Sequence, residues 1–288
     1  MTRTVEVSVV IPCRNAAEHI GELFDSLAQQ DFQGHWEVVV ADNGSTDESL
    51  AIARRYSHQI PLRTCEAHGK ASSAAARKTG VLEATGGKLL FVDADDALAP
   101  GYVRHMCAAL DIHDCVAGRI DAETLNPGWL RSAHGDPWQT DDVWVAYRFL
   151  PSAGPAVGVR RELYDQVGGH DEAFSTAYDI ALSWAIQLSG RQIGFVKEAI
   201  YRYRFRSTWR GLFRQTLEWG REDVHLYTRF RAAGMPGRLR QESIGEWLTV
   251  GRLLLRAGER RARPELAVAL GACVGRLAGS LRYRVMYL

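Results

Sequence analysis

The chain has 288 residues, of which 46% are hydrophobic and 24% are charged, and its formal net charge is +1. These values are typical of a globular protein and exclude a disordered, collagenous or coiled-coil chain. No uninterrupted apolar run reaches the roughly 18–20 residues of a membrane span, and the N-terminus lacks a signal-peptide pattern, so we expect a cytoplasmic protein.

Strand and helix patterns alternate through the first hundred residues. Alternating or continuous β-branched residues indicate strands, and apolar residues three or four positions apart indicate helices. The expected elements are a strand over 5–11, a helix over 17–29, a strand over 36–41, a turn over 42–47 that opens a helix, a strand over 62–65, a helix over 71–84 and a strand over 88–92.

This alternation with short loops predicts a mostly parallel sheet with helices on both faces. Ligands of such sheets bind beyond the carboxyl ends of the strands. At those ends the sequence places polar side chains: Arg14 and Asn15 after the first strand, Asp42 at the second, and residues 93–96 after the fourth. Their positions are the first indication of a functional site.

The second hundred residues are less regular. Strands are expected at 115–120, 154–159 and 193–196, and a helix runs from Asp179 to about residue 188. The segment 121–153 is long and irregular, as functional segments often are, and we expect it to shape a ligand pocket. Its tryptophans either form a wall of that pocket or simply pack in the core; they are Trp129, Trp138 and Trp144.

From residue 208 onward the pattern is helical and strongly basic. Residues 201–288 contain eighteen arginines, no lysine and seven acidic residues, a net charge of +11, whereas residues 1–200 carry −10. The basic helices either pack on the acidic body or contact an anionic partner, such as the inner face of a membrane. No nucleic-acid recognition motif accompanies them, so nucleic acid is not an expected partner.

The cysteines do not form a recognisable pattern. Their number is odd and no pair has CxxC spacing, which favours reduced thiols over a disulfide scaffold or a zinc site. They are Cys13, Cys65, Cys107, Cys115 and Cys273.

Two carboxylates, Asp93 and Asp95, directly follow the apolar strand 88–92. Carboxylates one residue apart at a strand end can converge on a hard cation such as Mg²⁺ or Mn²⁺, which is commonly shared with substrate phosphates. Aspartates in loops also cap helices, and Pro100 marks a helix start nearby. The segment Asp93-Ala94-Asp95 alone leaves both interpretations open, a metal site or a helix cap.

Four motifs in order strengthen the metal interpretation. They are VVIPCRN at 9–15, DNGSTD at 42–47, the segment 69–80 with Arg77, and FVDADD at 91–96. In this order and spacing the chain resembles the family 2 glycosyltransferases, with Asn43 and Lys78 as mild departures. Looser likenesses follow at 154–161, 167–172 and 178–184.

The resemblance implies a GT-A fold: a Rossmann-like, mostly parallel sheet flanked by helices. We expect a catalytic domain over 1–205 and a basic helical region over 206–288. It also implies an inverting, metal-dependent transfer of a sugar, of hexosyltransferase type, from a nucleotide-diphosphate donor to a hydroxyl group. The acceptor would be a glycan, a lipid-linked molecule or a small-molecule precursor.

The resemblance also suggests residue roles. The metal ligand is expected to be Asp95, with Asp93 sharing the metal or contacting the ribose, and the cofactor Mn²⁺ or Mg²⁺. Asp42 is expected to bind the nucleobase, on which the Arg14 guanidinium is able to stack. The remaining donor-binding candidates are Pro12, Asn15, Lys70 and Arg77, the last two facing the donor phosphates.

Asp179 is the expected general base, because an inverting transfer needs a carboxylate that takes the acceptor's proton. The family usually has an acidic residue where this chain has Tyr178 and another where it has Ala181. A different alignment would give the role to Asp171 or Glu172, and a helix N-cap is the structural alternative for Asp179.

Other functions fit the sequence less well. The departures around Asp179 are compatible with an inactive module that binds a nucleotide sugar, although Arg77, Asp93 and Asp95 are present. A sugar nucleotidyltransferase would need a glycine-rich loop after the first strand, and a dinucleotide dehydrogenase would need GxGxxG there. The sequence has neither.

Overall fold

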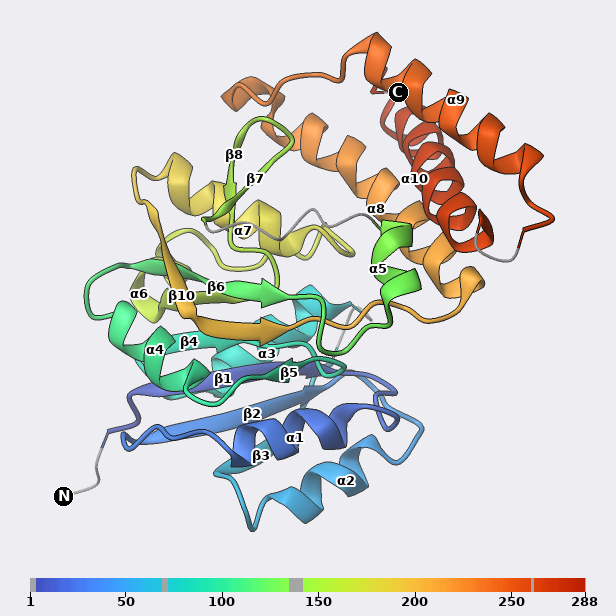
Figure 1. Ribbon diagram of the computed structural model, residues 1–288. Coiled ribbons are helices and arrows are strands. Elements are labelled where there is room, and N and C mark those ends of the chain that lie inside the picture. Colours follow the sequence, from blue (N-terminus) through green and yellow to red (C-terminus); the bar gives the residue numbers. More distant parts are fainter. Residues whose placement is uncertain (1–3, 69–71, 135–141, 260–261, 288) are drawn as a thin grey trace.

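A computed structural model describes residues 4–68, 72–134, 142–259 and 262–287, and within these ranges a mixed eight-stranded sheet forms the centre of the molecule (Figure 1). In spatial order its strands are β3 (Leu62–Glu66), β2 (Trp36–Asp42), β1 (Val7–Cys13), β4 (Lys88–Phe91), β9 (Val157–Arg160), β6 (Cys115–Asp121), β10 (Ile193–Arg202) and β5 (Ala97–Leu98). Strands β3, β2, β1 and β4 are parallel, as are β6 and β10, while β9 runs antiparallel to β4 and β6. The predicted mostly parallel α/β fold is confirmed.

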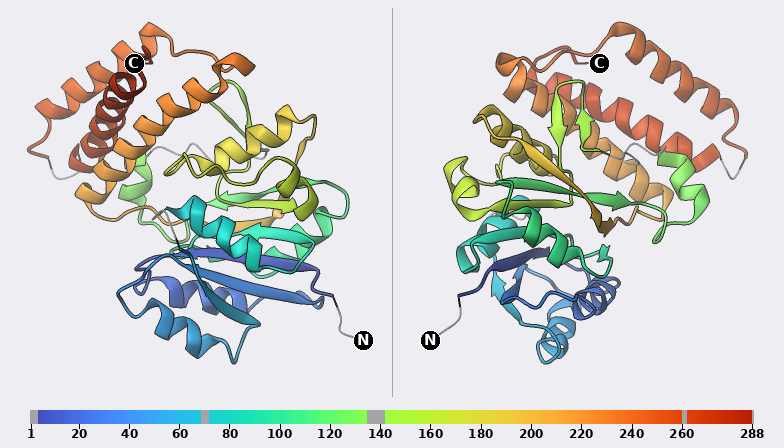
Figure 2. Two further views of the ribbon diagram at one scale, coloured as in Figure 1. Left: turned by 180° about the vertical axis from the view of Figure 1, so that it is seen from behind. Right: turned by 60° about the vertical axis from the view of Figure 1, so that its left-hand side comes forward.

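Helices cover both faces of this sheet (Figure 2). One face carries α1 (Ile20–Ala28), α2 (Ser49–Tyr56) and α4 (Tyr102–Ala109), and the other carries α3 (Ser73–Glu83), α6 (Arg161–Gln166) and α7 (Tyr178–Leu188). In β1, Val9 and Ile11 pack on the first face and Val10 on the second, and all three are fully buried. Burial on both sides explains why this strand is a continuous apolar run.

Two strands differ from their expected bounds. β9 begins at Val157 rather than at residue 154, because Gly154 has a φ of +56° and belongs to a turn. β10 continues to Arg202, well past the expected end at 196. Its pairing with β6 shifts between Val196 and Ile200, and this irregularity places two charged residues, at 197 and 198, inside the strand. Those charges hid the second half of the strand from a hydrophobicity pattern.

The remaining elements lie on the α7 side of the molecule, with α5 beside the end of the sheet and the others farther from it (Figure 1). They are α5 (Gly128–His134), the hairpin β7 (Trp144–Ala146) and β8 (Leu150–Ser152), and the helices α8 (Trp209–Phe230), α9 (Arg240–Leu255) and α10 (Ala262–Tyr283). A cluster that includes Trp184 of α7 and Phe230 of α8 joins this layer to the body, with their rings edge to face at 5.1 Å.

The helices α8 and α10 are in close contact. A Cβ atom added to Gly275 of α10 would lie 2.2 Å from the carbonyl oxygen of Leu217, and one added to Gly220 of α8 would lie 2.4 Å from that of Ala272. Within the described residues, α10 is the one helix long and apolar enough to cross a membrane, and 39% of its most apolar window is buried. Such a helix is weak evidence of a span, because a packed core helix passes the same test.

Candidate functional site

The carboxyl ends of β2, β1 and β4 lie next to one another, because these three parallel strands are neighbours in the sheet. In the pairing register Cys13 of β1 stands beside Asp42 of β2. The loops after β1 and β4 carry the other polar side chains that the sequence singled out. The strand order therefore brings the predicted donor-binding segments to one edge of the sheet.

The loop after β1 is joined to the loop after β2 by Asn15. Its side-chain Oδ1 accepts a hydrogen bond from the backbone amide of Thr46 at 2.8 Å, and its backbone amide donates to Ser45 Oγ at 3.0 Å. Asn15 has a φ of +51°, a left-handed conformation that asparagine tolerates. Pro12 before it is buried, whereas Arg14 is exposed and makes no ion pair with any described residue. Asn15 thus shapes the edge, and Arg14 extends from it.

Asp42 presents a buried carboxylate with one unused oxygen. Oδ2 accepts from the Ser45 amide at 3.1 Å, whereas Oδ1 has no partner, although Asp42 is only 5% exposed. Leaving a buried acceptor unpaired costs free energy that a ligand's N–H group would recover. The geometry fits the predicted contact with a nucleobase.

Arg77 of α3 is 1% exposed and reaches Asp93, with Nη2 2.5 Å from Oδ1. The Tyr178 ring lies 4.4 Å from the guanidinium carbon on the other side. Burial alone would lower the pKa of Arg77, but Asp93, Tyr178 and Tyr201 together outweigh it, and the pKa rises above its usual value. Nε and Nη1 have no hydrogen-bond partner among the residues that the structure describes. The guanidinium is therefore positioned within the protein, and the N–H bonds of two of its nitrogens are left for an anion.

The third aspartate after β4, Asp96, holds the loop in place. It is 1% exposed, and its oxygens accept from the Tyr201 hydroxyl and from the Arg204 amide, both at 2.7 Å. The Tyr201 hydroxyl also accepts from the Asp93 amide at 3.0 Å. Because both oxygens of Asp96 are used, its role is structural: it joins the loop after β4 to β10.

Asp93 and Asp95 each keep one oxygen that accepts no hydrogen bond from a side chain or amide of the described residues. Asp93 Oδ1 contacts Arg77, and Asp95 Oδ2 lies 3.1 Å from Nη1 of Arg206. Burial and then the neighbouring Asp93 raise the pKa of Asp95, which Arg206 partly opposes. Arg206 was missed by the sequence analysis; the available signal was the succession of arginines at 202, 204 and 206.

The described residues contain no group of three or more His, Cys, Asp or Glu side chains that could hold a metal ion. The edge of the sheet where β2, β1 and β4 end, with the loops that follow these strands, is called the rim from here on. It nevertheless offers two carboxylates, Asp93 and Asp95, of the kind that hard cations prefer. Mg²⁺ and Mn²⁺ are commonly held by one or two carboxylates together with substrate phosphates. The free oxygens of Asp93 and Asp95 fit a cation shared in this way.

Asp179 lies in the first turn of α7, and its Oδ1 accepts from the Ile180 amide at 2.8 Å. The N-cap of this helix is Ala177, so the alternative of a capping aspartate at 179 is wrong. Burial raises the pKa of Asp179 to about 6, with Asp93 adding to the rise and Arg77 opposing it. Asp179 is thus within electrostatic reach of the ion pair at the rim.

The two rival acidic residues have other partners. Asp171 lies 3.8 Å from Nε of Arg229, and its Oδ1 accepts from the Ala173 amide at 2.9 Å. Glu172 lies 3.3 Å from Nζ of Lys78. These contacts hold both side chains in surface ion pairs.

The tryptophans that were expected either to line a pocket or to pack in the core differ in their surroundings. Trp144 of β7 packs edge to face with Tyr147 at 6.5 Å, whereas Trp129 of α5 is 47% exposed. Trp138 and Lys70 lie outside the described residues.

All five cysteines are free thiols.

Comparison with protein families finds that residues 8–168 match the model described as Glycosyl transferase family 2. The match includes Asp42, Arg77, Asp93 and Asp95 and ends before Asp179. The chain is 28% identical over 250 residues to the succinoglycan biosynthesis protein ExoA of Rhizobium meliloti, covering 81% of this chain and 72% of ExoA.

Other relatives are matched over a smaller part of their length. The uncharacterized glycosyltransferase YibD of Escherichia coli is 32% identical over 49% of this chain and 39% of its own. The Staphylococcus aureus poly(ribitol-phosphate) beta-N-acetylglucosaminyltransferase TarS is 33% identical over 38% of this chain and 19% of its own. The chain therefore spans well under half of these two proteins.

Solved structures share the fold. The mannosyltransferase PcManGT from Pyrobaculum calidifontis, in complex with GDP-Man and Mn²⁺, aligns with a TM-score of 0.63 at 19% identity, over 96% of this chain and 88% of that one. Residues 1–349 of S. aureus TarS, in complex with UDP-GlcNAc, align with a TM-score of 0.58 at 17% identity, over 99% and 93%. Both alignments extend into the C-terminal helices.

Proposed function

The chain belongs to glycosyl transferase family 2, and from this premise we propose that it transfers a sugar, with inversion, from a nucleotide-diphosphate donor to a hydroxyl group of a glycan, lipid-linked or small-molecule acceptor. One observation carries the proposal: Tyr178, the residue before Asp179, has its ring 4.4 Å from the guanidinium carbon of Arg77, which is paired with Asp93 at the rim. The raised pKa of Asp179, about 6, agrees with this placement. A base and an anion-binding rim on one site are what this transfer needs. In this proposal 1–205 are the catalytic domain and 206–288 an accessory region.

In the proposed reaction Asp179 accepts the proton of the acceptor hydroxyl as its oxygen attacks the anomeric carbon of the donor sugar. The bond from that carbon to the diphosphate oxygen breaks, and the configuration inverts. A carboxylate with a pKa near 6 is ionised at neutral pH and is a better proton acceptor than an ordinary one. The partial burial of Asp179, which raises its pKa, therefore serves the step directly.

The leaving diphosphate gains negative charge that the rim is suited to receive. Asp93 and Asp95 would hold Mn²⁺ or Mg²⁺, which when bound supplies Lewis-acid neutralisation of that charge. Arg77 keeps Asp93 in position, and Arg206 is a second cation at the same place. The PcManGT structure, whose description includes GDP-Man and Mn²⁺, supports a divalent cation here.

We expect nucleotide binding to depend on metal through Asp95. In Asp95→Asn, Mn²⁺ should no longer add to the rise in melting temperature caused by a nucleoside diphosphate, because one anionic ligand is lost. The apparent affinity for Mn²⁺ should fall by at least about tenfold. Thermal-shift titration with UDP, GDP and dTDP, with and without Mn²⁺, measures this.

The matched control is Asp111→Asn, an exposed carboxylate paired with Lys88 away from the rim. It should keep the full effect of Mn²⁺. An unchanged metal effect in Asp95→Asn would assign the cation to other residues.

The pH profile should report Asp179. Because its pKa is raised to about 6, the carboxylate is ionised above that pH and protonated below it. We expect kcat/KM to fall about tenfold per pH unit below pH 6, since a protonated base accepts no proton. The profile is measured with a coupled assay of nucleoside diphosphate release; activity that stays flat down to pH 4.5 would contradict the assignment.

The second candidate is an inactive module that binds a nucleotide sugar. Tyr178 favours it, because the family usually has an acidic residue at this position, and here an aromatic ring lies against Arg77 beside the Asp93 carboxylate. Release of nucleoside diphosphate from a nucleotide sugar separates the two: an enzyme hydrolyses the donor slowly even without acceptor, whereas a binding module returns it intact.

A further inference from the structure

The outer side of α9 is apolar and exposed. In Figures 1 and 2 this helix lies at the periphery of the C-terminal layer, away from the sheet. Its large apolar side chains, between 43% and 90% exposed, are Ile244, Trp247, Leu248, Leu254 and Leu255. Exposed apolar residues scattered singly are ordinary, but a group of this size on one helix indicates an interaction surface.

These side chains form one stripe. At 3.6 residues per turn, positions 244, 247, 248, 251, 254 and 255 fall on a single side of the helix, with Gly251 at its middle. Val250 and Leu253, which lie outside this stripe, are buried within the molecule. The helix therefore has one apolar side that packs against the rest of the protein and a second apolar side that is exposed to solvent.

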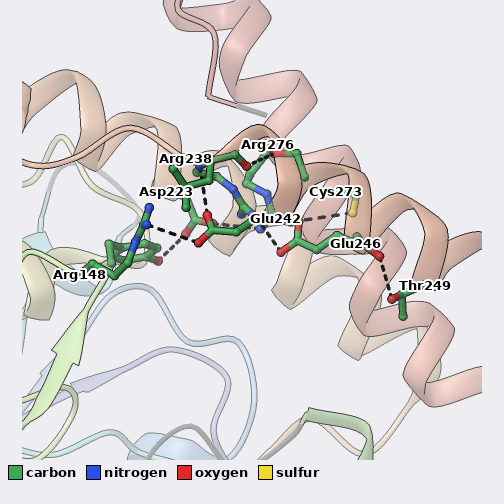
Figure 3. Close-up of polar contacts among 12 residues, drawn as sticks. Arg148, Asp223, Arg238, Glu242, Glu246, Thr249, Cys273 and Arg276 are labelled. Atoms are coloured by element: carbon green, nitrogen blue, oxygen red, sulfur yellow. Dashed lines mark hydrogen bonds and ion pairs between the residues drawn. The ribbon is translucent and has the colours of Figure 1, made fainter.

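The charges of α9 are divided in the same way. Glu246 is paired with Arg238 at 2.8 Å and with Arg276, and Glu242 lies 3.5 Å from Arg148 (Figure 3). The acidic side chains of this helix are thus neutralised by arginines of neighbouring segments.

The basic side chains of α9 are not used in this way. Arg240 and Arg252 are exposed and form no ion pair with any described residue. On the helix Arg240 falls within the stripe and Arg252 beside it. What α9 presents to solvent is therefore an apolar stripe with a net positive charge.

We propose that α9 lies in the surface of an anionic lipid bilayer, with its stripe among the acyl chains and Arg240 and Arg252 at the headgroups. An amphipathic helix with a tryptophan and flanking arginines has the chemistry of such an interface. A second copy of this chain fits less well, because each copy carries +11 over residues 201–288 and would bring like charges together. The inference does not depend on the proposed sugar transfer.

The test uses the full chain with vesicles of phosphatidylcholine alone or with 30% phosphatidylglycerol, separated by flotation. We expect binding to the anionic vesicles that falls with salt. The double variant R240Q/R252Q should weaken the partition coefficient roughly 30-fold, at about fivefold per arginine. The double variant L248S/L255S should abolish binding, because it removes buried apolar area at the interface.

Two controls match these variants. R54Q/R55Q changes two exposed arginines of α2, and I112S changes a side chain that is 80% exposed on the sheet domain. Both should bind as the unchanged chain does, and all variants should keep its melting temperature. Equal binding of L248S/L255S and the unchanged chain would overturn the proposal. So would absence from anionic vesicles at low salt, or a dimer in light scattering that L248S/L255S dissociates.

Discussion

Replacing Asp179 with asparagine should lower kcat by about 10²–10⁴-fold, the range over which a general base contributes. Asparagine has nearly the shape of aspartate but accepts no proton from the acceptor. The Ile180 amide, which donates to Asp179 Oδ1 at 2.8 Å, keeps an oxygen partner in the variant. The turn should therefore be retained, and nucleotide affinity, measured by thermal shift, should change less than threefold.

The informative control is Asp171→Asn. Asp171 is the rival base, but its contact with Arg229 at 3.8 Å and with the Ala173 amide gives it a structural explanation. We expect this variant to keep at least half of the activity. Near-normal turnover in Asp179→Asn together with a large loss in Asp171→Asn would transfer the role of base to Asp171.

Replacing Arg77 with methionine should be the most destabilising substitution at the rim. The guanidinium is nearly fully buried, and its removal leaves Asp93 without its cation and the Tyr178 ring without its neighbour. Breaking a buried pair costs 3–5 kcal/mol, and because a quarter of the Asp93 side chain is exposed we expect the lower end, about 3 kcal/mol. That loss corresponds to a fall in melting temperature of roughly 6–10 °C.

The matched control is Arg104→Met, which breaks the ion pair with Asp31 at 3.0 Å between side chains that are each about half exposed. A surface pair contributes less than about 1 kcal/mol, so its melting temperature should change by at most roughly 3 °C. Equal shifts in the two variants would show that the Arg77 pair has no special structural role.

Arg77→Met also links the two predictions. Arg77 lowers the pKa of Asp179, while Asp93 raises it. Without the guanidinium the pKa of Asp179 should rise. The acid limb of the pH profile, measured on the residual activity, should therefore lie at higher pH than in the unchanged chain. A limb that stays in place would mean that Arg77 and Asp179 do not share a site.

The first four strands and the edge where they end could be predicted from the sequence. Val9, Ile11 and Val10 form an apolar run because β1 is buried on both faces, and such runs are visible without a structure. The carboxyl ends of parallel strands lie at the same edge of a sheet. Because β2, β1 and β4 are parallel neighbours, Asp42 and Asp93 lie at one edge. The family resemblance over 5–100 rested on the same residues, and it is confirmed.

The roles of neighbouring aspartates could not be predicted. Asp95 and Asp96 are adjacent and chemically identical, yet Asp96 is fully bonded by Tyr201 and Arg204, more than a hundred residues away, whereas Asp95 keeps a free oxygen. Arg206 comes to Asp95 over a similar separation. No local pattern carries this information, because the contacts arise from the docking of β10 at the far side of the sheet.

The basic C-terminal region shows the same division. The sequence alone determined that it is helical and carries +11, since composition and periodicity are local properties. Packing decided which side of α9 is covered and which faces solvent. Arg276 of α10 and Arg238 form ion pairs with Glu246, and Val250 is buried within the molecule. Periodicity identifies apolar residues along a helix, but only the neighbouring helices decide which of them lose contact with water.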